Sequence, residues 1–121
     1  MRAALAQELS GIGSVKLGEL PDPVPAAGQA LVRVHGTGVG PWDVGFLGGG
    51  FPGVALPFVP GQEVAGVVET AGDGAGVEPG ERVYASLFPA GGGFAERGAG
   101  VGGPAGPDAR AGRASPRRPG W

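Results

Sequence analysis

The chain has 121 residues, among them 28 Gly and 13 Pro, and it carries a formal net charge of −2 and no Cys. The lack of Cys excludes disulfides, iron–sulfur clusters and thiolate zinc sites. The weakly acidic charge provides no basic surface for nucleic acid. Because 41% of the residues are hydrophobic and many stand in short runs, we expect one folded domain rather than a wholly low-complexity chain.

The predicted elements are short strands with Gly-rich turns between them. In chain order, strand-like runs occupy 1–6, 13–18, 29–36, 63–70, 81–86 and 92–96. Between the third and fourth of these runs, Pro41 and Asp43 predict one short helix at 41–47, since Pro favours the first helical position and an acid suits the first turn. Several short strands with little helix point to an all-β barrel or sandwich.

Composition and charge change after residue 96. Residues 1–96 carry a net charge of −6, whereas 97–121 carry +4 and consist mostly of Gly, Ala, Arg and Pro. Val101 is the only aliphatic residue larger than Ala in the second segment. Such a segment cannot bury enough apolar surface to offset its ordering entropy. We therefore expect a folded part, 1–96, and a disordered tail, 97–121.

Neither a targeting signal nor a membrane span is indicated. The apolar run at 3–6 is too short for a signal peptide. The longest uncharged stretch, 44–62, contains six Gly and three Pro and would not form an unbroken helix in lipid. The sequence thus indicates a soluble, cytoplasmic protein with neither nucleic acid nor membrane as a partner.

A glycine motif and a lone histidine could suggest phosphate binding and base catalysis, but their surroundings in the sequence do not support these functions. Gly98, Gly100 and Gly103 match G-x-G-x-x-G, but Pro104 and Pro107 follow where a phosphate-binding helix would have to begin, so we reject this match. His35 alternates with Val on one expected strand, which favours a solvated strand residue over a catalytic base.

The other chemistry-bearing side chains each have two interpretations. Asp43 suits a first-turn carboxylate as well as a catalytic group. Glu63 is equally consistent with a surface acid and with a site residue. Trp42, Phe46 and Tyr84 fit core or rim aromatics as well as substrate contacts. Taken singly, these residues identify no activity.

Three segments in a fixed order do carry a resemblance. The first follows the pattern P-x-x-P-G-x-E-x-x-G-x-V, the second V-x-P-G-[DE]-R-V, and the third reads GGFAE. They stand at Pro57, Pro60, Gly61, Glu63, Gly66 and Val68; at Val77, Pro79, Gly80, Glu81, Arg82 and Val83; and at 92–96. In this order they resemble the N-terminal, GroES-like domain of medium-chain dehydrogenases/reductases over about residues 1–96. The resemblance implies a partly open β-barrel with one short helix.

Departures from the zinc-dependent pattern indicate the branch. Gly40-Pro41-Trp42-Asp43 stands where zinc-dependent members have Cys-Gly-Thr-Asp, and Gln62 stands where they have His. The metal would lose both ligands, and Gln is a poor ligand for zinc. The chain is therefore similar to the zinc-independent quinone oxidoreductase branch. In that branch Asn stands at the position of Gly40, where it helps to bind the cofactor or substrate.

The resemblance implies an NADPH-dependent quinone oxidoreductase-like or alcohol dehydrogenase-like enzyme that transfers a hydride to a quinone or an enone. NADPH would be held by a second, Rossmann-type domain of the parent enzyme, so we expect no cofactor, no metal and no catalytic residue in this chain, which would be inactive alone. The domain would supply the wall of the substrate cleft. The candidates for that wall are Gly40, Trp42, Asp43, Phe46, Glu63 and Tyr84.

After Glu96 the family continues with an aromatic residue and a Val-rich strand, whereas this chain has Arg97-Gly98-Ala99-Gly100. The tail is rich in Gly, Ala, Arg and Pro, which GC-rich codons encode, so it resembles an out-of-frame translation. We interpret the chain as an N-terminal fragment with a frameshift near Glu96; the alternative is a genuine short protein with a disordered tail.

In a fragment, the strand edges near 81–96 would lack partners and favour self-association. Trp42, Phe46 and Phe58 would also face water. A second functional class stays open: a non-enzymatic, co-chaperonin-like β-barrel that binds another protein.

Overall fold

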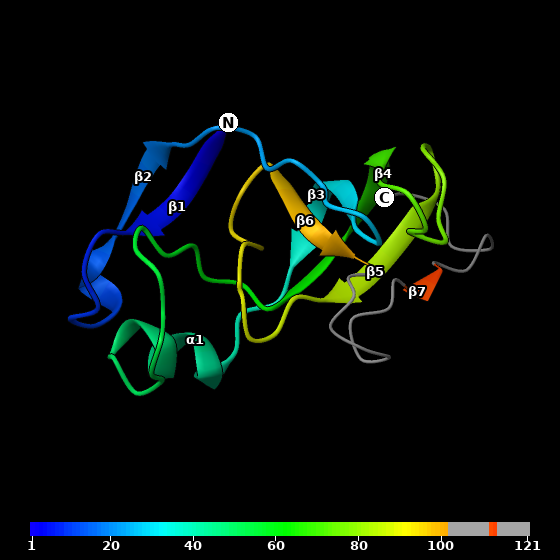
Figure 1. Cartoon of the computed structure of the whole chain (residues 1–121). Helices are drawn as coiled ribbons and strands as arrows, with labels where there is room; N and C mark the ends of the chain where they lie inside the picture. The colour runs from blue at the N-terminus through cyan, green and yellow to red at the C-terminus, as the bar shows by residue number, and fades with distance from the viewer. Residues whose placement is uncertain (102–111, 114–121) are drawn as a thin grey trace.

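The computed structural model describes residues 1–101 and 112–113, and its strands form two antiparallel sheets (Figure 1). A two-stranded sheet pairs β1 (Arg2–Ala6) with β2 (Val15–Glu19), which are joined through a 3-10 turn, η1 (Ile12–Ser14). A five-stranded sheet has the order β6-β3-β4-β5-β7. Its strands are β3 (Ala30–Thr37), β4 (Glu63–Ala71), β5 (Arg82–Ser86), β6 (Arg97–Val101) and β7 (Gly112–Arg113).

One α-helix interrupts the strands. Helix α1 (Pro41–Leu47) has the bounds that Pro41 and Asp43 predict, and it lies beside the small sheet at the end of the molecule away from β5 and β7 (Figure 1). The Gly11 amide fixes its C-terminal end by donating to the Leu47 carbonyl over 2.8 Å. The expected all-β fold with one short helix is confirmed.

The two sheets remain open: in the described residues they do not close into a barrel, and isolated bridges join β1 to two segments outside the strands. Ala3 bridges to Ala95, and Ala6 bridges to Phe58. The second bridge is a reciprocal pair of backbone hydrogen bonds of 2.8 and 2.9 Å between Ala6 and Phe58. The β1–β2 sheet is thus attached both to the loop after α1 and to the segment before β6.

Two apolar clusters stabilise this arrangement. The five-stranded sheet covers the first cluster, in which alternate residues of β4, such as Val64 and Val68, face inward because side chains alternate along a strand. Its buried members are Ala30, Val32, Val64, Val68, Val83, Ala85 and Leu87. The second cluster joins β1, α1 and the loop after α1 through Ala6, Phe46, Leu47 and Phe58.

Two expectations at the end of the folded part are wrong. Residues 92–96 form a loop with one bridge at Ala95 instead of a strand, and the strand begins only at Arg97. Gly91 and Gly92 have φ of 75° and 110°, values that break an extended strand at this point. The folded sheet therefore continues to Val101, beyond the expected boundary at residue 96.

Strand β6 belongs to the sheet through its backbone and one side chain. It pairs antiparallel with β3, and the Arg97 Nε donates to the Glu69 Oε2 over 2.8 Å. This hydrogen bond and the charge of Glu69 raise the pKa of Arg97 further above its usual value. Of the remaining expected tail, Gly112 and Arg113 pair with β5, and 102–111 and 114–121 lie outside the described residues.

In the part of the chain that the structure describes, none of the helices has the length and apolar character that crossing a membrane requires.

Close approach of β3 and β4 at Gly66 yields a stability prediction. A Cβ on Gly66 would lie 2.0 Å from the Arg33 carbonyl oxygen, so the central strands would have to separate. We expect Gly66→Ala to lower the free energy of unfolding by roughly 3 kcal/mol, as overpacking of a close backbone contact does. Urea denaturation measures this loss. Gly36→Ala on the same β3–β4 pair is the matched control, since a Cβ there meets nothing within 4 Å; an equal loss in both variants would contradict the account.

Candidate functional site

The structure divides the six candidate residues between two places. Gly40, Trp42, Asp43 and Phe46 lie in α1 or directly before it, whereas Glu63 and Tyr84 lie on the neighbouring strands β4 and β5. His35, which the sequence pattern predicts to be a solvated strand residue, is exposed on β3. The rejected Gly-rich motif contributes Gly98 and Gly100 to β6, while Gly103 is outside the described residues.

Asp43 is a buried anchor of the backbone. Its side chain is 3% exposed. Oδ2 accepts a hydrogen bond from the Gly40 amide over 2.9 Å, and Oδ1 accepts one from the Gly61 amide over 3.0 Å. The carboxylate thereby satisfies an amide before the first turn of α1 and places its charge at the positive end of the helix. Both oxygens are engaged with backbone amides, so Asp43 fixes the start of α1 relative to Gly61.

Gly40 and Trp42 form a close contact around Pro41. Gly40 has φ of −133°, an ordinary extended conformation that any residue adopts. A Cβ at this position would nevertheless lie 2.3 Å from both Cε2 and Cζ2 of Trp42. The indole ring therefore covers the Cα of Gly40, and 38% of Trp42 is exposed.

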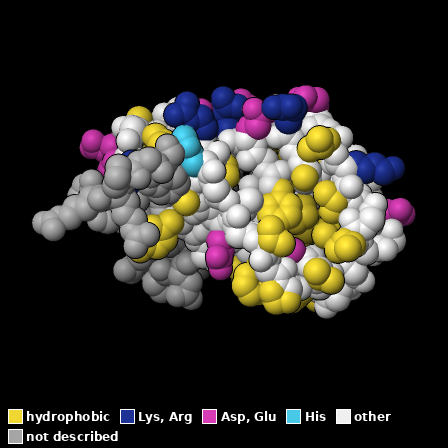
Figure 2. Space-filling view, turned by 180° about the vertical axis from the view of Figure 1, so that it is seen from behind, with side chains coloured by type: hydrophobic (Ala, Val, Ile, Leu, Met, Phe, Trp, Pro, Cys, Tyr) yellow, Lys and Arg dark blue, Asp and Glu magenta, His cyan; other side chains and the backbone are white. Residues whose placement is uncertain are grey.

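Phe46 lies in the second apolar cluster. It is 2% exposed, and its ring stacks on Phe51 with centroids 4.1 Å apart and on Phe58 at 5.4 Å. The expectation that Phe46 and Phe58 face water is wrong, because the loop after α1 folds back and covers them. On the outside, Phe88 meets Phe46 edge-on and is 55% exposed. Hydrophobic side chains gather over this end of the molecule (Figure 2).

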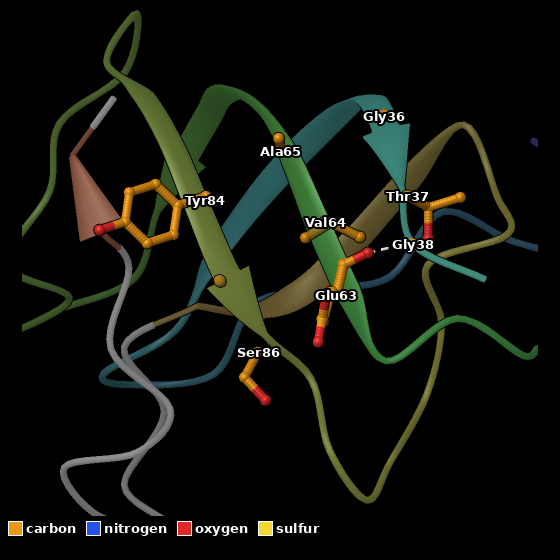
Figure 3. A pocket seen from close by; sticks show the side chains of 9 residues that line it. Gly36, Thr37, Gly38, Glu63, Val64, Ala65, Tyr84 and Ser86 are labelled. Carbon is orange, nitrogen blue, oxygen red and sulfur yellow. Dashed lines mark hydrogen bonds between the residues drawn. The ribbon is translucent and has the colours of Figure 1, made fainter. Parts of the chain in front are cut away.

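Glu63 and Tyr84 line one open hollow of about 490 Å³ at the ends of β3, β4 and β5 (Figure 3). In the sheet register, Glu63 is opposite Ser86 and Ala65 is opposite Tyr84. Tyr84 is 59% exposed, and its ring extends from β5 away from Glu63 (Figure 3). The full lining is Gly36, Thr37, Gly38, Glu63, Val64, Ala65, Tyr84, Ala85 and Ser86.

The segment 61–63 connects the two places. Asp43 holds Gly61 at one end, and the Glu63 carbonyl accepts from the Thr37 hydroxyl over 2.8 Å and from the Gly38 amide over 3.1 Å at the other. Gln62 between them is 1% exposed, and its Oε1 accepts from the Gly91 amide over 3.1 Å. The first turn of α1 and the hollow are thus fixed to the same stretch of backbone.

Sequence reasoning considered Gln62 only as a replacement for a metal ligand and missed its structural role. It also missed Thr37, Gly38 and Ser86, which line the hollow. The register between β4 and β5 brings Ser86 to this place, and no local pattern marks it.

The donor set does not fit a metal centre. The described residues contain no group of three or more His, Cys, Asp or Glu side chains that could hold an ion. Gly40 and Gln62 stand at the two positions where the zinc-dependent pattern has its ligands; Gly40 has no side chain, and the Gln62 Oε1 accepts from the Gly91 amide.

Known proteins similar to this chain share its fold and part of its sequence. The family profile "Alcohol dehydrogenase GroES-like domain" matches residues 26–105. The chain is 36% identical to rat quinone oxidoreductase over 99 residues, which cover 79% of this chain and 30% of that protein. It is 37% identical to human quinone oxidoreductase over 95 residues, with 76% of this chain and 29% of that protein covered.

Among solved structures, a probable oxidoreductase from Mycobacterium abscessus has a TM-score of 0.72 and 38% identity over 82% of this chain and 31% of the other. The mycobacterial protein Rv1454c, solved in complex with NADPH, has a TM-score of 0.80 and 32% identity over 97% of this chain and 33% of its own.

The open pair of sheets and the turn at α1 thus define a GroES-like domain, and the chain belongs to the family of alcohol dehydrogenase GroES-like domains. Within this family it resembles the quinone oxidoreductases of the medium-chain dehydrogenase/reductase group, which confirms the resemblance that the sequence motifs carry. It spans about 30% of the length of these relatives. The alternative of a co-chaperonin-like binding module is not favoured by these similarities.

The role of Asp43 leads to a second stability prediction. Asp43→Ala would leave the amides of Gly40 and Gly61 without their acceptor, and hydrogen bonds to a charged group are the costly ones to lose. We expect the free energy of unfolding to fall by about 3 kcal/mol in chemical denaturation. Glu63→Gln is the control, because this side chain is exposed and should change stability by less than about 0.5 kcal/mol. Similar small effects in both variants would show that Asp43 is no anchor.

Proposed function

We propose that this domain forms the substrate-side wall of the cleft in an NADPH-dependent oxidoreductase that transfers a hydride to a quinone or an enone. The observation that carries the proposal is the segment 61–63, which fixes the α1 turn and the open hollow to the same end of the central strand β4. Similarity to quinone oxidoreductases and to a protein solved with NADPH supports the same reaction class.

In this proposal NADPH, when bound, supplies the hydride, and the domain supplies binding and orientation of the acceptor. The buried residues Asp43 and Phe46 hold the wall in place, whereas Trp42, Glu63 and Tyr84 present exposed surface to the substrate. Apolar side chains at such a wall exclude water from the reacting atoms, which protects a hydride in transit.

We infer that NADPH itself is held outside this domain. The Asp43 carboxylate already lies at the N-terminus of α1, and its charge would repel the pyrophosphate that a helix N-terminus otherwise attracts. In this proposal the chain alone is inactive, because this domain does not hold the cofactor that carries the hydride.

Exchange of domains tests this proposal. Residues 1–101 of this chain would replace the matching part of Rv1454c, and NADPH oxidation would be followed with 1,4-naphthoquinone as acceptor. We expect quinone-dependent turnover by the chimera and none by the 121-residue chain, which should bind NADPH with a Kd no tighter than about 1 mM. A chimera that folds and binds NADPH but does not reduce the quinone would contradict the proposal.

We also propose that the parent enzyme works without zinc, on the basis of Gly40 and Gln62 at the expected ligand positions. The purified chain, dialysed after exposure to zinc, should retain far less than one ion per chain in elemental analysis. Gln62→His restores one imidazole and serves as a comparison, although a single added ligand should still not retain the ion. One zinc per unmodified chain after dialysis would refute a zinc-independent enzyme.

A further inference from the structure

Strand β2 is a free edge of the fold. It pairs with β1 on one side, and among the described residues no strand pairs with its other side, at the end of the molecule away from β5 and β7 (Figure 1). Of the edges that the sequence indicated near 81–96, the segment 94–96 is hydrogen-bonded to both β1 and β3, and β5 pairs with β7. The small sheet thus offers β2 as a place where a further strand can be added.

The hydrogen bonds of β1 show which backbone groups of β2 are free. Ala4, the residue opposite Leu17, donates its amide away from β2 to the Phe94 carbonyl over 2.8 Å. The pair of Ala4 and Leu17 is therefore one of the non-bonded pairs that alternate with bonded pairs along an antiparallel ladder. Glu19, two residues on, occupies the same kind of position. The N–H and C=O groups of Leu17 and Glu19 thus point to the open edge, whereas those of the even-numbered residues of β2 bond to β1.

Leu17 places an apolar side chain at the middle of this edge. It is 83% exposed although it lies within a strand. The residue opposite it on β1 is Ala4, whose single methyl group is too small to cover a leucine. One exposed leucine is ordinary on a protein surface. At this position, however, it coincides with free backbone donors and acceptors, which together are what an added strand binds.

We propose that β2 pairs with β2 of a second copy of this chain, antiparallel and with Leu17 on the two-fold axis. The inference does not depend on the proposed function. Leu17 lies directly opposite its counterpart, and each leucine covers the other. Val15 lies opposite Glu19 of the other copy, so no like charges stand directly opposite each other. Lys16, a residue type that usually discourages edge pairing, lies opposite Gly18, which leaves room for its side chain.

This register uses the free backbone groups. Leu17 exchanges reciprocal hydrogen bonds with its counterpart, and the amide of Glu19 donates to the carbonyl of Val15 in the other copy. The two small sheets become one sheet of the order β1-β2-β2-β1, which is more stable than a two-stranded sheet alone. Because both copies use the same edge, the assembly closes at a dimer.

Sedimentation velocity and amide exchange of the 121-residue chain test the dimer. A five-residue edge is much smaller than a standard interface, so we expect a weak dimer with a Kd on the order of 100 μM. The amides of Leu17 and Glu19 should then exchange about fourfold more slowly at about 1 mM chain than at about 20 μM, as mass action gives for this Kd. The amides of Lys16 and Gly18 bond to β1 in both states, so their exchange should not depend on concentration.

Charge exchange at position 17 tests the two-fold axis. Leu17→Lys and Leu17→Glu should each weaken dimerisation by about tenfold or more, because each removes the apolar contact and sets like charges opposite one another. An equal mixture of the two variants should dimerise again, since opposite charges then meet across the axis. Leu56→Lys is the matched control: Leu56 is 50% exposed in the loop after α1, and this variant should dimerise like the unmodified chain.

A chain that stays monomeric at about 1 mM would refute the pairing, as would slower exchange at high concentration that spares Leu17 and Glu19. Dimers that Leu56→Lys disrupts and Leu17→Lys does not, or a mixture of Leu17→Lys and Leu17→Glu that stays monomeric, would also overturn it. Assembly beyond a dimer would do the same, because the symmetric pairing occupies the edge in both copies. Since Leu17 is exposed, the amide signals of the core should be unchanged in its variants, which separates loss of the dimer from unfolding.

Discussion

The carboxylate of Asp43 is the interaction on which the arrangement of this domain most depends. It joins the residue before α1 to Gly61, a residue 18 positions further along the chain. Backbone amides that lie inside a protein must find acceptors, and a charged acceptor gives the strongest such bonds. The Asp43 side chain thus fixes both the start of α1 and the position of the backbone that leads into β4.

The other features of the site follow from this anchor. With α1 in place, Phe46 points into the cluster that Phe51 and Phe58 complete, so the loop after the helix is packed instead of open. With Gly61 in place, Glu63 enters β4 where Thr37 and Gly38 can bind its carbonyl. Trp42 is left between two fixed residues, with Gly40 beneath its ring. Binding surfaces supported in this way need little reorganisation when a ligand arrives.

The parts of the fold that sequence predicts are those with a local physical cause. Alternation of Val with smaller or polar residues predicts β3 and β4, and Pro41 with Asp43 predicts the bounds of α1. Strand β6 was missed because Gly98 and Gly100 give no strand pattern; pairing with β3 and the contact between Arg97 and Glu69 make it a strand. Tertiary contacts here override a weak local preference.

The candidate site was predicted in the same partial way. The motif resemblance selected two segments that the structure joins through Gly61 and Glu63, but it could not separate the buried residues Asp43 and Phe46 from the exposed Trp42 and Tyr84. That distinction depends on how the loop after α1 folds and on the register of β4 with β5. Both are long-range properties, which a seven-residue helix and five-residue strands do not encode by themselves.

Amide hydrogen exchange at Gly61 tests the central role of Asp43 most directly. If the carboxylate holds this residue in the folded unit, the Gly61 amide should exchange as slowly as that of Val68, which donates to Glu81 beside the central strand β4. Asp43→Asn should accelerate exchange at Gly61 while the Val68 amide keeps most of its protection. Exchange of Gly61 in the unmodified chain as fast as at Gly53, in the loop after α1, would contradict the account.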